Sequence, residues 1–266
     1  MSAKNFDTPE IVGLIPAGGQ ATRIAPLPCS KELYPIGFQQ RKEGGSVPKV
    51  VSQYLLDKMR FAGISKAFFV LRPGKWDIPA YFGDGSMLNM HFAYLTITGP
   101  PFGVPFTLDH AYPFLSHVNV AFGFPDILFD SDDAFLKLLS RQSETRADLT
   151  LGLFPAEQSL KVDLVETTED GWVKKMVVPP EDSNLIYTWN LATWTPAFTE
   201  YLHEFVRSHA TAAMKGPELI AGHVVQSAVR DGLKVLGVPI SDTPYLDIGT
   251  PRGLAAATRR TAERVL

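Results

Sequence analysis

Short runs of apolar residues recur along most of this chain, and stretches with a helical spacing of apolar positions separate them. A run of about four to eight apolar residues bounded by Gly, Pro or Asp is typical of a buried strand. On this pattern we predict strands at 11–16, 66–71, 91–96, 118–124, 149–154, 163–167, 173–178, 187–193, 233–238 and 245–248.

Amphipathic segments between these runs predict helices. Ser46 followed by Pro48 is typical of a helix start, so we expect a helix from there to Gly63. Ser131 is a second expected N-cap, for a helix that ends near Ser140. Further helices are expected from the end of a 99–105 loop to 115, at 78–82, 196–209 and 219–230, and from 251 onwards.

The connection from Gly18 to Gly45 is rich in Gly, Pro and charge, and we predict that it lacks regular structure. Connections of that length are uncommon and often functional. The alternation of strands with helices predicts a mostly parallel sheet that is covered on both faces. Ligands bind such sheets at the carboxyl ends of the strands, which is where the unusual turns of this chain fall.

Composition narrows the classes of protein that fit this pattern. The 266 residues are 45% hydrophobic and 20% charged, as in an ordinary globular protein. A formal net charge of −3 gives no general electrostatic reason to bind nucleic acid or an anionic membrane, and we expect neither partner. Cys29 is the single cysteine, which excludes an internal disulfide. With no apolar signal or membrane-spanning run, the expected location is the cytoplasm.

The turn after the first predicted strand runs from Ala17 to Arg23 and reads Ala-Gly-Gly-Gln-Ala-Thr-Arg. Glycines let the backbone approach a phosphate closely, and successive N–H groups can form an anion nest. The Arg23 guanidinium adds a fixed fork of donors for phosphate oxygens. An ordinary strand-to-loop turn with a surface arginine is the alternative. The spacing matches neither the dinucleotide-binding fingerprint nor a P-loop.

Three charged residues stand in further turns of interest. Lys31, in Ser-Lys-Glu-Leu-Tyr-Pro, could neutralise charge on a phosphoryl group, or could simply pair with Glu32 at the surface. Asp126 and Asp247 each follow a predicted apolar strand, where a carboxylate suits Mg²⁺. Each aspartate could instead belong to a turn or to a helix start, with Thr250 as the N-cap after Asp247.

Together these motifs resemble those of the glucose-1-phosphate thymidylyltransferase-like sugar nucleotidyltransferases. The shared order is Ala-Gly-Gly-x-x-Thr-Arg, Ser-Lys-Glu-Leu-x-Pro, a strand that ends in Asp, and Leu-Asp-x-Gly-Thr-Pro. The resemblance covers nearly the whole chain. It includes 48–64, similar to the family's first long helix, and Gly83 to Ser86, similar to its Gly-Asp-Gly-Ser turn.

The resemblance implies a three-layer α/β/α, Rossmann-like and GT-A-like nucleotidyltransferase fold with a mixed, mostly parallel central sheet. It implies a single domain over 1–266, with a nucleotide-binding half at 11–130, a sugar-phosphate-binding half at 148–250 and a C-terminal helix at 251–266. The family often forms dimers or tetramers, so a homo-oligomer is compatible with this sequence.

The resemblance also implies an enzyme, with a nucleoside triphosphate and a sugar-1-phosphate as its partners. By default these are dTTP or UTP and glucose-1-phosphate, and the products are a nucleotide sugar and pyrophosphate. Arg23 would hold the leaving pyrophosphate, and Lys31 would stabilise the α-phosphoryl group. Asp126 and Asp247 would share Mg²⁺ as the cofactor. The implied nucleotide-binding residues are Ala17, Gly18, Gly19, Gln20, Ala21, Thr22, Thr98 and Gly103.

The chain departs from the family pattern at several positions. Ala21 replaces a usual glycine, so the loop is strained if this position needs a positive φ. The family's Glu-Lys-Pro before a turn is Val177-Val178-Pro179 here. Asp163 replaces a glycine that faces the sugar, and Trp189 or Asn190 replaces another. The candidate sugar-phosphate-binding residues are therefore Asp163, Lys175 and Asn190.

Two alternatives of other classes stay open at this stage. The altered sugar motif and Ala21 are also compatible with a non-catalytic protein that binds a nucleotide or a nucleotide sugar on the same fold. Asp130 and Asp132 form an Asp-x-Asp pair, which glycosyltransferases of similar architecture use to hold a metal. Ser131 and Asp132 fit a helix start better, which disfavours the glycosyltransferase.

Overall fold

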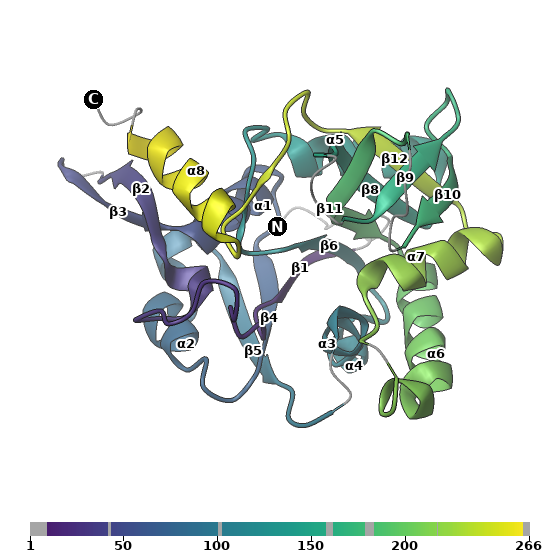
Figure 1. The fold of residues 1–266 in the computed structure, drawn as a ribbon, viewed down its shortest axis with the longest axis horizontal. Coiled ribbons are helices and arrows are strands. Elements are labelled where there is room, and N and C mark those ends of the chain that lie inside the picture. Colours follow the sequence, from purple (N-terminus) through teal and green to yellow (C-terminus); the bar gives the residue numbers. More distant parts are fainter. Residues whose placement is uncertain are drawn as a thin grey trace, which may run out of the picture.

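A nine-stranded mixed sheet forms the centre of the computed structural model, which describes residues 10–41, 44–100, 103–157, 162–178, 184–216 and 218–262 (Figure 1). Four neighbouring strands are parallel, in the order β5-β4-β1-β6. Their bounds are β1 Ile11–Pro16, β4 Lys66–Leu71, β5 His91–Thr96 and β6 Asn119–Gly123. Because these strands are parallel, their carboxyl ends lie along one edge, where the expected phosphate loop follows β1.

Beyond β6 the sheet becomes antiparallel through β11, which pairs with β6, β8 and β9. β10 pairs antiparallel with β9, and β12 pairs parallel with β8. The bounds are β8 Leu149–Pro155, β9 Leu164–Thr167, β10 Val173–Val177, β11 Tyr187–Trp194 and β12 Val235–Pro239. The sheet is therefore mixed, as predicted, and runs without interruption through both expected halves of the chain.

Helices cover both faces of the sheet, which confirms the three-layer prediction (Figure 1). Along β1, Leu14 packs into the core on one face and Ile15 into the core on the other, because side chains alternate along a strand. The first core includes residues of α3 Val104–Asp109, α4 Tyr112–Leu115, α6 Pro196–Ala213 and α7 Ala221–Arg230. The second includes residues of α1 Val51–Phe61, α2 Asp77–Phe82 and α5 Ala134–Thr145.

Two smaller sheets lie outside the central one. β7 (Ile127–Leu128) pairs antiparallel with β13 (Leu246–Asp247), and β2 (Pro35–Gln40) pairs with β3 (Ser46–Val50). The C-terminal helix α8 (Pro251–Ala262) packs against β2 and β13 (Figure 1). These pieces and the start of α1 share a third core whose buried members are Ile36, Val51, Leu128, Ile248 and Ala257. This core joins the end of the chain to the region that follows β1.

The predicted lack of structure from Gly18 to Gly45 is wrong, because this segment contains the 3₁₀ helix η1 (Lys31–Leu33) and the strand β2. The predicted helix start at Ser46 is wrong too, since Ser46 lies in β3 and α1 begins at Val51. The Ser46 hydroxyl accepts a hydrogen bond from the Gln40 side chain across the hairpin instead of capping a helix. Burial alternates with a period of two residues along this segment, which suits a strand and not a helix.

Two other helix predictions need correction. α5 begins at Ala134 rather than directly after Ser131, whose hydroxyl donates a hydrogen bond to the Asp133 side chain, and it continues to Thr145. The single helix expected up to residue 115 is two, α3 and α4, with a further 3₁₀ helix η2 (Ser86–Leu88) earlier in the chain. The residues 263–266 of the expected C-terminal helix lie outside the described residues.

The start of α8 agrees with its sequence signals. The Thr250 hydroxyl accepts a hydrogen bond from the backbone N–H of Gly253 at 3.1 Å, which confirms the predicted N-cap, and Pro251 is the first helical residue. None of the helices in the described ranges is both long and apolar enough to cross a membrane.

Substitution of Gly253 tests how tightly α8 holds β13. A Cβ at this position would lie 2.0 Å from the carbonyl oxygen of Asp247, so the helix must move away. We expect Gly253→Ala to lower the free energy of unfolding by about 1–3 kcal/mol through overpacking, in spite of the roughly 1 kcal/mol that Ala gains in a helix. Urea unfolding measures this. The control, Ala255→Ser on the exposed side of α8, should change it by less than about 0.5 kcal/mol; equal stabilities for both variants would contradict the packing.

Candidate active site

A cleft of about 450 Å³ opens at the carboxyl edge of the parallel strands. Its size suits a small-molecule ligand. Its walls come from the turn after β1, the ends of β4 and β6, and the start of α3. The lining residues are Pro16, Gly18, Gly19, Gln20, Thr22, Lys31, Arg72, Gly103, Val104, Thr107, Phe124, Asp126 and Glu218. Seven of these residues were singled out from the sequence, namely Gly18, Gly19, Gln20, Thr22, Lys31, Gly103 and Asp126, whereas Arg72 and Glu218 were not.

The glycine-rich turn lies close to other parts of the cleft wall. Ala17 is buried and donates a backbone hydrogen bond to Val70 on β4, which anchors the start of the turn. A Cβ on Gly18 would lie 3.0 Å from Cγ of Arg72, and one on Gly19 would lie 3.3 Å from Nζ of Lys31. The glycines therefore leave room for both cationic side chains beside the backbone of the turn.

Ala21 adopts a φ of +54°, in the left-handed region that favours glycine. The strain expected at this departure from the family pattern is therefore present. Ala in this region costs roughly 1–2 kcal/mol relative to the right-handed conformation. Strain of this kind persists only where the surrounding structure holds it, and it clusters at functional sites.

The central contact of the cleft joins Lys31 to Asp126. Their side-chain atoms Nζ and Oδ2 are 2.6 Å apart, and both side chains are largely buried, at 16% and 9% exposure. Burial alone would lower the pKa of Lys31, but the adjacent Asp126 carboxylate raises it above its usual value. Lys31 is therefore a fixed cation in the wall of the cleft.

Asp247 lies next to this pair, because β13 pairs with β7 directly after Asp126. The backbone N–H of Ile248 donates to the Asp126 carbonyl at 3.1 Å. A Cβ on Gly249 would lie 2.9 Å from Oδ1 of Asp247 and 3.2 Å from Oδ2 of Asp126, so both carboxylates converge on this glycine. Burial and the charge of Asp126 both raise the pKa of Asp247.

Arg23 completes the charged cluster from the exposed side. Its Nη2 is 3.1 Å from Oδ2 of Asp247, and its side chain is 62% exposed. The structure thus brings together the four charged residues singled out from the sequence: Arg23, Lys31, Asp126 and Asp247. Two aspartates and two cations alternate within one small region at the mouth of the cleft.

The donor set fits a hard divalent cation. No group of three or more His, Cys, Asp or Glu side chains that could hold a metal occurs among the described residues. Mg²⁺ does not need one, since it is commonly held by one or two carboxylates together with waters and substrate phosphates. Asp126 and Asp247 supply two such carboxylates, and their mutual repulsion is the kind that a bound cation relieves.

The buried ion pair between Glu32 and Lys75 stabilises the segment that carries Lys31. Glu32 is fully buried and binds Nζ of Lys75 at 2.7 Å, while Ser52 donates to the Glu32 carbonyl. Burial raises the pKa of Glu32, and Lys75 opposes that rise. The Ser30 backbone N–H and hydroxyl both bind Asp77 at the start of α2. These contacts fix η1, and with it Lys31, to the body of the protein.

A second cleft, of about 370 Å³, lies on the other side of Lys31. It shares Gln20 and Lys31 with the first cleft and continues along Cys29, Lys75 and Asp77. Burial and the neighbouring Asp77 and Glu32 carboxylates raise the pKa of the Cys29 thiol, so it stays protonated. A thiol in that state is a poor nucleophile.

The other end of the first cleft is formed by Gly103 and its neighbours. Gly103 has a φ of +122° and forms a parallel bridge with Leu219, whose carbonyl oxygen would lie 2.4 Å from a Cβ there. Only glycine fits this position. Thr98, in contrast, is exposed beyond the end of β5 and does not line the cleft, so its expected role stays a prediction.

The three candidate residues of the sugar-phosphate half do not form one cluster. Asp163 precedes β9 and lies against Gly222 of α7, where a Cβ would be 2.2 Å from its Oδ2. Asn190 is buried in β11, at a bulge between the pairs of Trp189 and Leu191. Lys175 is exposed on β10, opposite Glu166. Pro179 of the altered motif lies outside the described residues.

The Asp-x-Asp pair lies away from the cleft. Asp132 binds Nζ of Lys58 at 2.7 Å, and Asp130 binds Arg260 of α8. Neither aspartate lines the cleft. These contacts tie α1 and α8 to the segment after β7, which is a structural use of both carboxylates.

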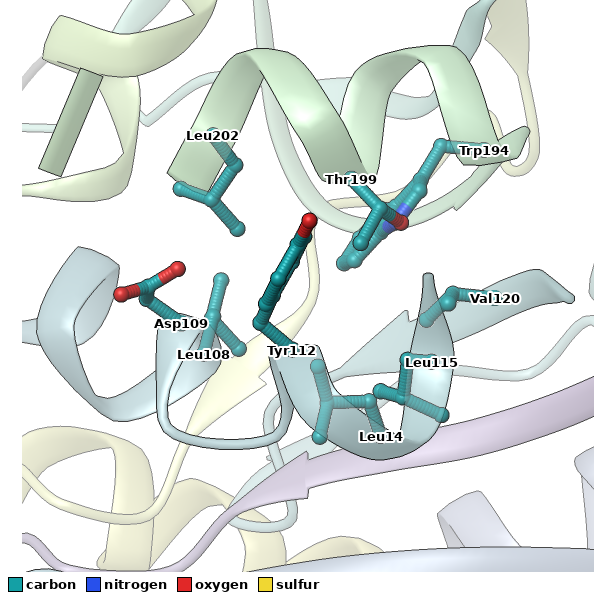
Figure 2. Close-up of a pocket in the computed structure, with 9 residues that line it drawn as sticks. All are labelled: Leu14, Leu108, Asp109, Tyr112, Leu115, Val120, Trp194, Thr199 and Leu202. Carbon is teal, nitrogen blue, oxygen red and sulfur yellow. The ribbon is translucent and has the colours of Figure 1, made fainter. Parts of the chain in front are cut away.

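A small interior cavity of about 10 Å³ lies between β1, α4 and α6 (Figure 2). That volume is about enough for one water molecule. Figure 2 shows Tyr112 between Leu202 and Thr199 of α6 and the apolar side chains Leu14 and Leu115. The cavity is a packing gap in the first core and is separate from the charged cleft.

Comparison with known proteins identifies the fold. No protein-family model and no curated protein matches this chain in sequence. A structure from Bacillus anthracis, described as a glucose-1-phosphate thymidylyltransferase in complex with sucrose, matches with a TM-score of 0.78 at 15% identity, over 94% of this chain and 95% of that one.

Two structures of UDP-glucose pyrophosphorylase also match, both at 17% identity. The complex with UDP-glucose has a TM-score of 0.76 over 96% of this chain and 99% of that one. The apo structure has a TM-score of 0.78 over 97% and 100%. At these identities the likeness shows the fold, which is the three-layer nucleotidyltransferase fold that the motifs predicted.

Removal of one partner tests the buried pair behind Lys31. Lys75→Met leaves the Glu32 carboxylate buried without its cation, which should cost about 3–5 kcal/mol in the free energy of unfolding near neutral pH. The folded-state pKa of Glu32 would rise further above its usual 4.5, so this loss should grow as the pH rises above that value.

Chemical denaturation across pH 5 to 8 measures the effect. The double variant Glu32→Gln/Lys75→Met carries no buried charge at this place and should recover part of the loss, without the same dependence on pH. An unchanged stability of Lys75→Met at neutral pH would contradict the role of this pair.

Proposed function

We propose that this protein is a sugar-1-phosphate nucleotidyltransferase that joins a nucleoside triphosphate to a sugar-1-phosphate and releases pyrophosphate. The observation that carries this proposal is the convergence of Arg23, Lys31, Asp126 and Asp247 at the mouth of the cleft. The fold shared with structures described as nucleotidyltransferases supports it. The sheet that crosses both halves supports a single working domain, and one free cysteine fits the cytoplasm.

The arrangement of charges suits in-line phosphoryl chemistry. An oxygen of the sugar phosphate would attack the α-phosphorus while the bond from that phosphorus to the bridging oxygen of the β-phosphate breaks, and pyrophosphate would leave with the electron pair. The attacking group is already an anion, so no general base is needed. Lys31 stands on the anchored element η1 and would stabilise the charge that develops on the α-phosphoryl oxygens.

The residues around Lys31 would bind the triphosphate, the leaving pyrophosphate and the cation. The backbone of Gly18 to Thr22 would hold the triphosphate, and the exposed Arg23 could turn from Asp247 to the leaving pyrophosphate. Asp126 and Asp247 would hold Mg²⁺, which, when bound, neutralises charge between the phosphates of the two substrates. Lys31 and Arg23, which lie against these carboxylates, would turn from them to contact the phosphates of the bound substrates.

Gly103 supports a nucleotide base at the far end of the cleft. Its missing side chain lets the chain approach Leu219 closely, and Val104, Thr107, Arg72 and Glu218 lie in the same wall of the cleft. The latter two side chains offer a donor and an acceptor for the base. Neither was evident from the sequence, because each is an isolated charged residue outside any motif.

A non-catalytic binding protein is the second candidate. Val178, near Gly222, stands where the resemblance predicts the sugar-phosphate lysine, and Ala21 strains the phosphate loop. Both observations favour it over the glycosyltransferase, whose Asp-x-Asp pair is engaged elsewhere. Tight nucleotide binding in a calorimeter without any turnover would support this candidate.

Pyrophosphate release is the direct test of the proposal. We expect a coupled assay with Mg²⁺ to detect turnover for at least one pair in a panel of nucleoside triphosphates and phosphorylated substrates. The panel should include dTTP, UTP, CTP, GTP and ATP, with glucose-1-phosphate as the default acceptor. If the folded protein releases no pyrophosphate with any pair, the proposed enzymatic function is wrong and the non-catalytic binding protein is the remaining candidate.

Substitution of the two carboxylates tests their role directly. Asp126→Asn and Asp247→Asn each keep the shape of the side chain and a hydrogen-bond acceptor but lose the charge that holds the cation. We expect kcat to fall by roughly 10²-fold or more, as for other groups that act only in the transition state. Asp242→Asn, an exposed aspartate of the same segment, is the control and should keep full activity. Near-normal turnover of both cleft variants, with a normal circular dichroism spectrum, would remove these carboxylates from the mechanism.

A further inference from the structure

Asp163 is an unusual residue in the expected sugar-phosphate-binding half of the protein, away from the glycine-rich turn of Gly18 to Thr22. It directly precedes β9. In the antiparallel pairing of β9 with β11, Val165 lies opposite Tyr187, and the same register places Asp163 opposite Trp189. Its carboxylate lies against Gly222 in the first turn of α7. Burial raises the pKa of Asp163 to about 6, although the Trp189 indole and the Gly222 N–H oppose this rise.

No positive side chain compensates this carboxylate in the part of the chain that the structure describes. Asp163 takes part in none of the ion pairs there, and no lysine or arginine contributes to its pKa. Its apolar neighbour is Val178, whose Cγ2 lies 2.8 Å from the position of a Cβ on Gly222. A phosphate dianion would be repelled at this place, since a carboxylate and a valine offer it no cation.

Asp163 lies within electrostatic reach of the same residue as Asp126 and Asp247. Tyr245, directly before β13, is largely buried, and the charges of Asp247, Asp163 and Asp126 add to that burial to raise its pKa to about 12. All three carboxylates are therefore close enough to Tyr245 to act on it. The chain also enters α7 from the cleft wall, through Glu218 and the bridge of Leu219 with Gly103. Asp163 is not one of the residues that line the cleft; it lies against α7, which follows the cleft wall directly along the chain.

Two consecutive side chains of β11, the strand beside Asp163, have buried polar atoms without a partner. The indole Nε1 of Trp189 is close enough to affect the carboxylate but forms no hydrogen bond of regular geometry, and Trp189 is 8% exposed. Both amide atoms of Asn190, which is 3% exposed, are also unpartnered. Asn190 lies at the β-bulge of β11, and bulges commonly re-aim side chains next to active sites. Buried polar atoms without partners are costly unless a ligand or water satisfies them.

Capping of α7 does not by itself explain a carboxylate here. An acceptor for the Gly222 N–H could equally come from Asn, Ser or Thr, without the cost of a buried charge. A partly buried carboxylate without a counterion is instead neutralised by an organic cation, because an opposite charge beside it favours its ionised form. The missing counterion would then be supplied by the substrate.

We propose that Asp163 is a specificity-determining residue that selects, as the acceptor, a phosphate monoester carrying a protonated amine. The amine would pair with the Asp163 carboxylate, Asn190 would bind a neighbouring polar group of the same substrate, and the phosphate would point away from them toward Asp126 and Asp247. This inference rests on the proposed nucleotidyltransferase function and names the class of its second substrate. An amino sugar phosphate and an amino alcohol phosphate share this chemistry.

Matched acceptors test the proposal on the full chain. Glucosamine-1-phosphate is compared with glucose-1-phosphate, and phosphoethanolamine with glycerol-1-phosphate, each with Mg²⁺ and the nucleoside triphosphates. We expect the amine of at least one pair to be preferred about tenfold or more in kcat/KM, the size of effect typical of a hydrogen bond to a charged group. The pair that responds distinguishes the sugar from the alcohol.

The variant Asp163→Asn separates recognition from structure. Asn still accepts a hydrogen bond from Gly222, so the melting temperature should change little, while the preference for the amine should fall about tenfold, mainly through KM. Asp163→Glu should restore part of the preference. Glu166→Gln, which removes a carboxylate from β9 itself, is the matched control and should leave the preference unchanged.

Each outcome decides the proposal. Turnover without a preference for the amine, or a preference that survives Asp163→Asn, overturns this inference and leaves the proposed function intact. If no pair turns over, the proposed function is wrong, and calorimetry then tests separately whether Asp163 binds an amine. Binding of either amine phosphate by the wild type that weakens about tenfold in Asp163→Asn supports the inference, and failure of both amines to bind overturns it.

Discussion

The pairing of β7 with β13 is the contact on which the rest of the site depends. It joins two segments far apart in the chain and places Asp126 beside Asp247. Two like charges so close would repel each other, and the structure compensates them with Lys31 and Arg23. α8 and the third core hold β13 in place, while Glu32 and Lys75 hold the segment of Lys31. Much of the fold outside the central sheet therefore serves to keep four charges within reach of one another.

The cleft and the neighbouring region near α7 differ in charge, and so they suit different groups of a substrate. On the side of the glycine-rich turn, the cations and backbone N–H groups suit the phosphates of a nucleotide. Near α7, beyond the residues that line the cleft, the charge is negative and partly buried, at Asp163, with unpartnered polar atoms in β11. The asymmetry places phosphate near the centre and an uncharged or cationic group at the far side. The departures from the family pattern at Asp163 and Val178 both lie against Gly222 of α7.

The sequence predicted the parallel strands well, because each is an apolar run closed by a turn. The bounds of β1, β4 and β5 agree with the prediction residue for residue. The convergence of Asp126 and Asp247 could also be expected, since both follow strands and belong to ordered motifs. The β2–β3 hairpin could not, because β2 packs against α8 from the other end of the chain, and Ser46 and Pro48 mimic a helix start. Arg72 and the Glu32–Lys75 pair carry no local signal, for only the folded chain brings them to the cleft or buries them.

A crystal structure with a nucleoside triphosphate and Mn²⁺ in place of Mg²⁺ would test the central claim most directly. Manganese gives an anomalous signal that locates the ion independently of the refined coordinates. We predict a peak bound by carboxylate oxygens of both Asp126 and Asp247, with the triphosphate along the Gly18–Thr22 backbone and Lys31 turned toward phosphate. A triphosphate bound with the ion elsewhere, and with Lys31 still paired to Asp126, would contradict the account.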